Sequence, residues 1–437
     1  MRKVLKFKGG VHPPERKLGT DVPIDRIPEP MRVFVPLSQH TGAPAKPTVE
    51  VGDYVLAGQL IGEAQGRISA NVHASISGTV KSIAERPHPA LRDVVAIEIE
   101  TDHKDEWVEL APADPDELSP EEIVDRVYRA GIVGLGGAAF PTHVKLAPPP
   151  NKPIEIVIVN GSECEPILTA DDRLMQEHAD EIVAGARLVA RAVGAKSLVI
   201  AVEDNKKTAI ARMRDAASRY DIPVVALRTR YPQGAEKQLI FALTGRQVPS
   251  GGLPMDVGAL VHNVGTCYAI WRAVAEGRPL TERVVTVVFK DKVKNFWVPI
   301  GTLARDVLTF AGIGLEGIKK LVFGGPMMGV AQYTAEVPVV KGTSGIVAFS
   351  EDELILERRE TSCIRCGRCV DVCPMGLVPT RLYSLALADM FSEAKRLGAL
   401  DCIECGCCSY VCPAGLKLVH GIRFAKSEIM MQMRKAG

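Results

Sequence analysis

The sequence lacks an excess of charge of either sign, and it lacks long hydrophobic runs. Its net charge of +1 at pH 7 provides no electrostatic attraction for nucleic acid. No apolar stretch reaches the ~18 residues that span a bilayer, and the first residues, MRKVLKFKGG, lack the apolar core of a signal peptide. We therefore expect no nucleic-acid partner, no transmembrane segment, and a place in the cytosol or on the cytosolic side of a membrane.

The remaining composition is that of an ordinary globular protein, with 46% hydrophobic and 24% charged residues. A chain of 437 residues is too long for a single hydrophobic core. The length therefore predicts three or four domains.

Cysteine carries the strongest pattern in the sequence. Eight of the eleven cysteines form two copies of one motif, CIRCGRCVDVCP from Cys363 and CIECGCCSYVCP from Cys402. Each copy reads C-x2-C-x2-C-x3-C-P, the ligand run of a bacterial ferredoxin with two 4Fe-4S clusters. This usage indicates a reducing compartment rather than a disulfide scaffold. Two zinc sites of four thiolates each are the alternative, although zinc sites usually pair two C-x2-C units.

The spacing also predicts how the ligands divide between the clusters. Three thiolates on a tight loop can bind three corners of a cube, and in two-cluster ferredoxins the fourth cysteine of each run crosses to the other cluster. The predicted ligands are Cys363, Cys366, Cys369 and Cys412 for the first cluster, and Cys402, Cys405, Cys408 and Cys373 for the second. Gly367 and Gly406 are expected inside the loops, where a side chain would crowd the sulfurs and where a positive φ is required. We interpret Cys407 as a bystander, and Cys164 and Cys267 as buried small hydrophobic residues.

Residues 31–105 consist of short β-runs separated by Gly and Pro. The succession VGDYV, GQLIGE, SGTVKSI resembles the barrel-sandwich hybrid of lipoyl and biotinyl carrier domains. Such carriers need a lysine at a hairpin tip, and here that position falls near Arg67, which cannot take the cofactor. We therefore expect a structural domain without a swinging arm.

A helix is predicted after Ser119, which is a suitable N-cap, with Pro120 at the first position and Glu122 completing a capping box. The next segment, IVGLGGAAFPTHVKL, contains G-x-G-x-x-A, but a helix precedes it where a dinucleotide-binding fingerprint would follow a strand. Three glycines, an aromatic residue and a lysine suit backbone amides that face a phosphate or a flat ring. A flexible loop without a ligand is the alternative.

Strand and helix patterns then alternate over about a hundred residues. Residues 154–160 predict a buried strand and residues 174–195 a long amphipathic helix, followed by SLVIAVE, a helix from Lys206 to Arg219, and VVALRTR. This alternation predicts a parallel sheet with helices on its faces. Two polar segments, NGSECEP at 160–166 and YPQGAEKQ at 231–238, follow strand ends of this sheet, where ligands bind in such folds.

Four segments, GLGGAAFPTHVK, VNGSECEP, YPQGAEKQ and HNVGT, resemble the ligand loops of the NADH-binding flavoprotein subunit of respiratory complex I. The resemblance implies a Rossmann-like domain that holds FMN non-covalently and takes NAD(H) as substrate. It places Gly134, Gly136, Gly137 and Lys145 near FMN and the nucleotide phosphates, Asn160, Ser162, Glu163, Gly234, His262 and Asn263 around the flavin, and Phe140, Glu165 and Glu236 towards NADH. No catalytic acid or base is expected, because hydride transfer needs none.

The sequence departs from that family at four loop positions. The family has Arg at the position of Leu135, Gly at Ala139, Asp at Ser162 and Glu at Ala235. These departures weaken the expectation of nucleotide affinity more than the expectation of flavin binding. Residues 281–335 resemble the soluble-ligand-binding β-grasp domain that follows the flavin domain in the same subunit, and its GGPMMG segment is interpreted as core and turn.

Over essentially its full length the chain resembles the RnfC family, whose members are subunits of Rnf-type ion-translocating electron transport complexes. The predicted fold is a multidomain α/β protein. Its expected parts are an N-terminal segment (1–30), a barrel-sandwich hybrid (31–105), a Rossmann-like FMN/NADH-binding domain (106–280), a β-grasp domain (281–350) and an α-helical two-cluster ferredoxin-type domain (351–437).

The family resemblance implies a peripheral subunit on the cytoplasmic face of a bacterial cell membrane, with the other Rnf subunits as partners. There it would pass electrons between NAD(H), FMN and two 4Fe-4S clusters, in a complex that couples ferredoxin–NAD redox chemistry to Na+ or H+ translocation. Three alternatives remain open. They are an FMN and 4Fe-4S cobalamin reductase of a microcompartment, a ferredoxin-like electron carrier with a vestigial flavin site, and a zinc-bound assembly scaffold.

Overall fold

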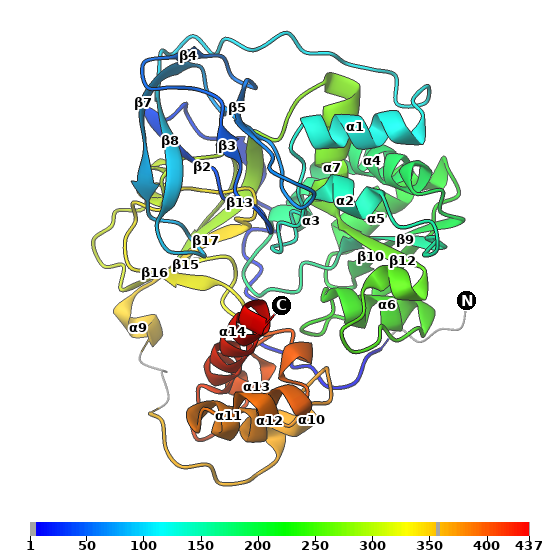
Figure 1. The fold of residues 1–437 in the computed structure, drawn as a ribbon, viewed down its shortest axis with the longest axis vertical. Helices are drawn as coiled ribbons and strands as arrows, with labels where there is room; N and C mark the ends of the chain where they lie inside the picture. The colour runs from blue at the N-terminus through cyan, green and yellow to red at the C-terminus, as the bar shows by residue number, and fades with distance from the viewer. Residues whose placement is uncertain (1–5, 355–358, 437) are drawn as a thin grey trace.

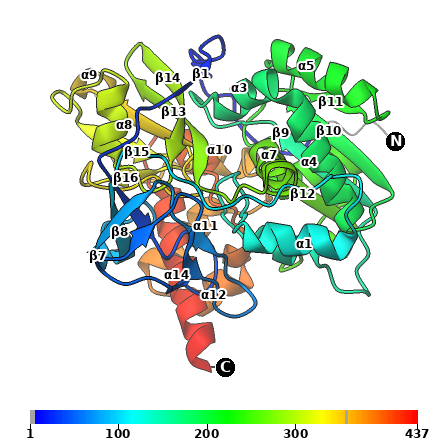
Figure 2. The same ribbon diagram turned by 90° about the horizontal axis from the view of Figure 1, so that it is seen from above.

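The structure is a computed structural model that describes residues 6–354 and 359–436. The first five residues of the predicted N-terminal segment, and residues 355–358 and 437 of the predicted ferredoxin-type domain, lie outside the described residues. The described part forms four β-sheets and a C-terminal helical unit, arranged as Figures 1 and 2 show. Among the described helices, none combines the length and the apolarity that crossing a membrane requires.

The first unit consists of two small antiparallel sheets with strand orders β2-β8-β7-β4 and β3-β5-β6, drawn in blue in Figure 1. Alternate side chains of the strands point into one core, where Ile61, Val72, Ile97 and Ile99 are completely buried. Arg67 is exposed in the connection between β5 and β6. The strands are β2 (Arg32–Pro36), β3 (Lys46–Pro47), β4 (Tyr54–Val55), β5 (Leu60–Glu63), β6 (Val72–His73), β7 (Gly78–Arg86) and β8 (Val94–Thr101).

The second unit is a four-stranded parallel sheet in the order β11-β10-β9-β12, which confirms the predicted parallel pairing. Its strands are buried on both faces, because α6 covers one face and α3, α4, α5 and α7 cover the other. The strands are β9 (Ile156–Gly161), β10 (Ser197–Glu203), β11 (Val224–Leu227) and β12 (Ala259–Asn263). The helices are α1 (Pro120–Arg129), α2 (Thr142–Leu146), α3 (Ala170–Glu177), α4 (Ala179–Ala192), α5 (Lys207–Ser218), α6 (Glu236–Thr244) and α7 (Val264–Trp271), with a 3-10 turn at Pro254–Val257 and a π turn at Arg272–Glu276.

Two local predictions in this unit have opposite outcomes. The capping box of α1 is confirmed, because the backbone N–H of Ser119 donates to Glu122 Oε2 at 2.8 Å and the N–H of Glu122 donates to Ser119 Oγ at 3.3 Å. The single helix predicted over residues 174–195 is wrong, because the chain leaves helical geometry at His178 (φ −132°, ψ 42°). The His178 ring packs 4.9 Å from Tyr268 and 6.0 Å from Trp297, so tertiary contacts break the helix into α3 and α4.

The third unit is a six-stranded mixed sheet in the order β1-β14-β13-β17-β15-β16. Its edge strand β1 comes from the N-terminal segment and pairs in parallel with β14, so the described residues that precede β1 cross the molecule to reach this sheet. The elements are β1 (Ile24–Arg26), β13 (Glu282–Phe289), β14 (Lys292–Pro299), α8 (Ala304–Phe310), β15 (Lys320–Phe323), β16 (Val330–Gln332), β17 (Gly345–Phe349) and α9 (Glu351–Leu354).

The fourth unit is helical and occupies the orange and red end of the chain in Figure 1. Its small core joins α11, α12 and α14 through Leu382, Leu385, Ala394 and Ile422. The helices are α10 (Arg368–Asp371), α11 (Pro379–Leu387), α12 (Phe391–Arg396), α13 (Cys407–Tyr410) and α14 (Leu418–Ala436), with a 3-10 turn at Ala399–Asp401.

A buried lysine joins the first three units. Lys341 has no exposed surface, and its Nζ donates to Asn71 O at 2.6 Å and to Gly131 O at 2.7 Å. These carbonyls belong to the first and second units, whereas Lys341 precedes β17 of the third. The backbone N–H of Thr41 also donates to Ala139 O at 3.1 Å, so the first unit contacts the glycine-rich loop directly.

Candidate functional site

The candidate site lies at the carboxyl edge of the parallel sheet, where β9 and β12 end. Asn160 Nδ2 donates to Gly234 O at 2.8 Å, which ties the loop after β9 to the loop before α6. A Cβ added at Gly234 would lie 3.3 Å from the Cβ of Ser162, and one added at Gly136 would lie 3.4 Å from the Cβ of Asn263. The structure therefore brings together the four segments that the sequence analysis selected.

The glycine-rich loop is a closed turn with an exposed tip. The N–H of Gly134 donates to Phe140 O at 2.9 Å, and the N–H of Leu135 donates to Thr266 Oγ1 at 2.9 Å, which fixes the loop against the start of α7. Gly136 and Gly137 are exposed at the tip, and Gly137 has a φ of +104°. Such a turn can present backbone N–H groups to a phosphate.

Lys145 and Glu236 meet at this edge. The Nζ of Lys145, on α2, donates to Glu236 Oε1 at 3.1 Å and to Val261 O at 2.7 Å. Glu236 stands at the start of α6, where a carboxylate is also stabilised by the helix dipole. The pair places one cation and one carboxylate side by side, both partly open to solvent.

Buried polar atoms without partners mark the same place. Among the described residues, Ser162 Oγ, Gln233 Nε2 and His262 Nε2 are buried and have no hydrogen-bond partner. Burial also holds the pKa of His262 well below its usual value, so the imidazole is neutral. Buried polar groups normally have partners, because an unsatisfied group costs ~1–3 kcal/mol. These donors and acceptors therefore fit a polar ligand such as the flavin that the sequence resemblance implies.

Glu163 and Glu165 are bound to backbone in this structure. The carboxylate of Glu163 accepts from the N–H groups of Asp171 (2.7 Å) and Asp172 (3.2 Å), at the start of α3. The carboxylate of Glu165 accepts from the N–H groups of Met327 (3.0 Å) and Met328 (2.8 Å), in the GGPMMG turn. Burial raises the pKa of each glutamate to about 7.

The two cysteine runs fold alike. Gly367 (φ +77°) and Gly406 (φ +76°) take the left-handed conformation, which confirms the expected positive φ. Backbone N–H groups point at the sulfurs, since Arg365 donates to Cys363 Sγ and Glu404 to Cys402 Sγ, both at 3.4 Å. Backbone N–H groups that donate to thiolates fit an iron–sulfur cluster, whose potential depends on such hydrogen bonds.

The two runs also interlock. Cys373, from the first run, lines one cavity together with Cys402, Cys405 and Cys408 of the second run. In the other direction, Cys412 packs against Cys369 in a shared apolar cluster. This arrangement supports the crossed division of ligands.

The two runs differ in exposure and protonation. Cys363 and Cys366 of the first run are exposed, whereas the cysteines of the second run are buried or half-buried. Burial raises the pKa of Cys402 to about 11 and that of Cys408 to about 12, so both thiols are protonated in the absence of a ligand ion. In the described part of the chain, no three His, Cys, Asp or Glu side chains are placed around a single metal ion.

The second cysteine run touches the candidate flavin side directly. Tyr231 Oη donates to Cys405 O at 2.8 Å, and burial raises the pKa of this phenol, which keeps it a donor. The first run also touches this side, because Gln238 Nε2, on α6, donates to Pro374 O at 3.3 Å. Cys407, interpreted from sequence as a bystander, is completely buried in this contact with Tyr231 and Cys405.

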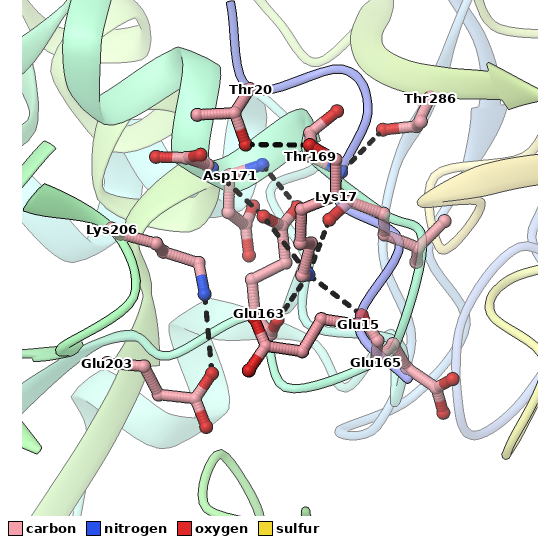
Figure 3. Close-up of polar contacts among 12 residues, drawn as sticks. Glu15, Lys17, Thr20, Glu163, Glu165, Thr169, Asp171, Glu203, Lys206 and Thr286 are labelled. Carbon is pink, nitrogen blue, oxygen red and sulfur yellow. Dashed lines mark hydrogen bonds and ion pairs between the residues drawn. The ribbon is translucent and has the colours of Figure 1, made fainter. Parts of the chain in front are cut away.

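Sequence reasoning missed Lys17. Its Nζ donates to the carbonyls of Glu163 (2.8 Å), Glu165 (2.8 Å) and Leu168 (2.5 Å) in the loop that follows β9, and Figure 3 shows Lys17 between Glu163 and Glu165. Beside it, Lys206 Nζ donates to Glu203 Oε2 at 3.3 Å in a second buried pair. No motif marks Lys17, and its partners lie far away in the sequence.

Three family models match this chain. They are the RnfC barrel sandwich hybrid domain over residues 5–104, the Nuo51 FMN-binding domain over residues 127–272 and the 4Fe-4S dicluster domain over residues 355–413. A solved NAD+-reducing [NiFe]-hydrogenase in the H2-reduced state is similar with a TM-score of 0.50 at 21% identity, over 72% of this chain. The match spans 64% of that hydrogenase chain and shows a shared fold. Fold, site and matches together define an iron–sulfur protein with an FMN-binding domain.

Curated relatives specify the family. The C subunit of the proton-translocating ferredoxin:NAD(+) oxidoreductase complex of Clostridium ljungdahlii is 50% identical over 97% of this chain and 93% of its own length. The C subunit of the Na(+)-translocating ferredoxin:NAD(+) oxidoreductase complex of Acetobacterium woodii is 44% identical over 98% of both chains. This chain belongs to the RnfC family of ferredoxin:NAD(+) oxidoreductase complex subunits.

Proposed function

We propose that this chain is the NADH-interacting flavoprotein and iron–sulfur subunit of an Rnf-type membrane complex. In that role it passes electrons between NAD(H), FMN and two 4Fe-4S clusters. It would bind peripherally to the other subunits, on the cytoplasmic face of a bacterial cell membrane. The two relatives are named for different ions, protons in one and Na+ in the other, so the proposal includes translocation of either ion by the whole complex.

The residues proposed to hold FMN are those of the converging loops. Backbone N–H groups of the exposed glycine turn and the Lys145 ammonium would bind phosphate, and the unpartnered Ser162 Oγ and His262 Nε2 would meet the flavin. The full proposed set is Gly134, Gly136, Gly137, Lys145, Asn160, Ser162, Glu163, Gly234, His262 and Asn263, with Phe140, Glu165 and Glu236 towards NADH.

When bound, FMN supplies the step from two-electron chemistry of NADH to one-electron chemistry of the clusters. The chain's own residues fix the loops that surround the proposed flavin site. Asn160, through its bond to Gly234 O, fixes the two loops that flank the site. Buried Tyr231 fixes the loop of the second cysteine run beside them, which would keep the two proposed cofactor sites adjacent.

The proposed cluster ligands are Cys363, Cys366, Cys369 and Cys412 for the first cluster and Cys402, Cys405, Cys408 and Cys373 for the second. The backbone N–H···S bonds from Arg365, Leu377 and Glu404 would stabilise the thiolates and raise the cluster potentials. The first run, with its exposed Cys363 and Cys366, is the side from which electrons would pass to partner subunits.

The contact between the loop of Tyr231 and the second cysteine run carries this proposal, because it joins a flavin-type site to a cluster site within one chain. A cobalamin reductase of a microcompartment is not favoured, since the relatives are Rnf subunits over nearly the full length. A plain electron carrier would not need the buried unpartnered atoms at the sheet edge.

The test is a titration of the full chain, reconstituted with iron and sulfide under anaerobic conditions, with FMN followed by fluorescence quenching. The proposal predicts one saturable FMN site per chain beside two 4Fe-4S clusters, and bleaching of the bound flavin by NADH. A reconstituted chain with both clusters and no saturable FMN site would contradict it.

A further inference from the structure

The N-terminal segment from Phe7 to Arg26 contacts the iron–sulfur unit, the loop of Tyr231 and the loop that follows β9. At its start, the N–H of Gly10 donates to Val372 O at 2.8 Å, next to Cys373. A Cβ at Gly9 would lie 2.7 Å from Cys373 O, so the segment touches the end of the first cysteine run, at a proposed ligand of the second cluster, with no room for a side chain. The strap, as we call residues 7–26, thus begins on the iron–sulfur unit.

The strap then passes to the flavin side. Val11 and Tyr231 exchange two backbone hydrogen bonds, at 2.8 and 3.0 Å. Tyr231 is also the residue whose hydroxyl donates to Cys405 O. The N–H of Ile167 donates to Glu15 O at 2.7 Å. Further on, Arg173 Nη1 of α3 donates to Thr20 O at 2.9 Å, and the strap ends as strand β1 on β14.

Lys17 is the centre of this contact. The three N–H groups of its ammonium donate to the carbonyls of Glu163, Glu165 and Leu168. No N–H group of Lys17 is therefore left without an acceptor. Glu163 Oε2 lies 3.9 Å from the same Nζ and compensates part of its charge, while burial lowers the pKa of Lys17. The side chain of Lys17 is 13% exposed, and an ammonium this far from solvent needs its hydrogen bonds satisfied.

The loop that Lys17 holds is strained. Glu163 (φ +43°) and Ile167 (φ +75°) are not glycines, yet both have left-handed backbone, which is unfavourable for residues with a Cβ unless the surroundings enforce it. The same loop carries Ser162, Glu163 and Glu165 of the proposed flavin and NADH site. The ammonium of Lys17 gathers the three carbonyls and so enforces the conformation of the loop.

We infer that Lys17 is a positioning residue for the flavin site, and that the strap fixes this loop in register with the second cysteine run. The inference rests on the proposed function, because the loop must contact FMN for its shape to matter. Lys17 itself need not touch the flavin, since it acts through the backbone of residues 163–168. Nothing in the sequence motifs of the site assigns a role to this residue.

The test uses the full reconstituted chain in three forms, namely wild type, Lys17→Met and Lys8→Met. Lys8 is exposed on the same strap, and Lys8→Met makes the same substitution as Lys17→Met, so it is the matched control. FMN is titrated by fluorescence quenching, which yields the Kd and the number of sites separately, and the EPR spectrum after dithionite reduction reports the clusters. We expect Lys17→Met to raise the Kd for FMN about tenfold, as for loss of charge-assisted hydrogen bonds, with the site number and the cluster spectrum unchanged.

The outcomes separate the possible failures. Equal Kd values in all three forms would overturn the role of Lys17. Fewer FMN sites with an unchanged Kd in Lys17→Met would also overturn it, because that pattern reports a fraction of misfolded chains rather than a misplaced loop. A wild-type chain without an FMN site would contradict the proposed function, and the inference with it.

Discussion

Cys373 belongs to the first cysteine run, yet it lines a cavity with Cys402, Cys405 and Cys408. Cys373→Ala should therefore perturb or abolish the second cluster and leave the first in place. The measurement is iron content together with the EPR spectrum of the dithionite-reduced chain. The buried neighbour Cys407 provides a control, because Cys407→Ala should keep both clusters. Loss confined to the cluster of Cys363, Cys366 and Cys369 would contradict the crossed ligand sets.

Lys145 supplies the cation of the proposed phosphate region. Lys145→Ala should weaken FMN binding about tenfold or more, because a hydrogen bond to a charged group contributes ~1.5–3 kcal/mol. Cluster content should not change. Lys152→Ala, which removes a lysine paired with Asp256 elsewhere on the same unit, is the control. Unaltered FMN affinity and unaltered NADH oxidation in Lys145→Ala would exclude this residue from the site.

His73 gives a residue-level pH dependence. Burial lowers its pKa to about 3, whereas an unfolded histidine titrates near 6.5. Between about pH 6.5 and pH 3 the unfolded state therefore binds a proton at His73 that the native state does not bind. The free energy of unfolding that neutral His73 contributes above pH 6.5 is lost as the pH falls. From pH 7 to pH 5 this single residue should lower the free energy of unfolding by about 2 kcal/mol. Urea unfolding of wild type and His73→Leu at both pH values checks this, since equal losses in the two proteins would contradict it.

The residues of the site differ in how far the sequence could predict them. The positive φ of Gly367 and Gly406 followed from the spacing of neighbouring cysteines, because the constraint is local. The convergence of Asn160, Gly234 and Asn263 followed from strand ends in a parallel sheet. Lys17 could not be predicted, since its three carbonyl partners lie about 150 positions away and carry no side-chain signature.

At the scale of the elements, the two cysteine loops offer a matched comparison. A Cβ at Gly367 would meet nothing within 4 Å, whereas one at Gly406 would lie 3.1 Å from Met327 O of the GGPMMG turn. Both Gly→Ala changes should cost about 1–2 kcal/mol from the left-handed backbone, and Gly406→Ala should cost more because the turn must also move. Thermal unfolding of the two cluster-loaded variants tests this. Equal losses would show that the turn does not constrain the loop.

Element boundaries show where local signals are sufficient. Ser119, Pro120 and Glu122 define the start of α1 because a capping box is a contact within four residues. The break between α3 and α4 could not be read in the same way. The periodicity of residues 174–195 continues through His178, and only the aromatic contacts with Tyr268 and Trp297, from distant parts of the chain, show why the helix stops.

At the scale of the whole molecule, the N-terminal strap and the loop of Tyr231 hold the proposed flavin site against the second cysteine run. The order of the units could be expected from their sequence patterns, whereas their contacts could not. The strap crosses from the iron–sulfur unit to the edge of the β1–β14 sheet, so residues that precede the first domain end up between the others. Long-range packing of this kind depends on shape complementarity, which no local pattern records.

The proposed function is tested most directly by freeze-quench EPR of the anaerobically reconstituted full chain, containing FMN, after addition of NADH. Electron transfer through the flavin predicts a signal of reduced 4Fe-4S cluster that appears together with bleaching of the flavin, and that is lost when FMN is omitted. Clusters that dithionite reduces but NADH does not, in a chain that holds FMN, would contradict electron transfer from NADH to the clusters within this protein.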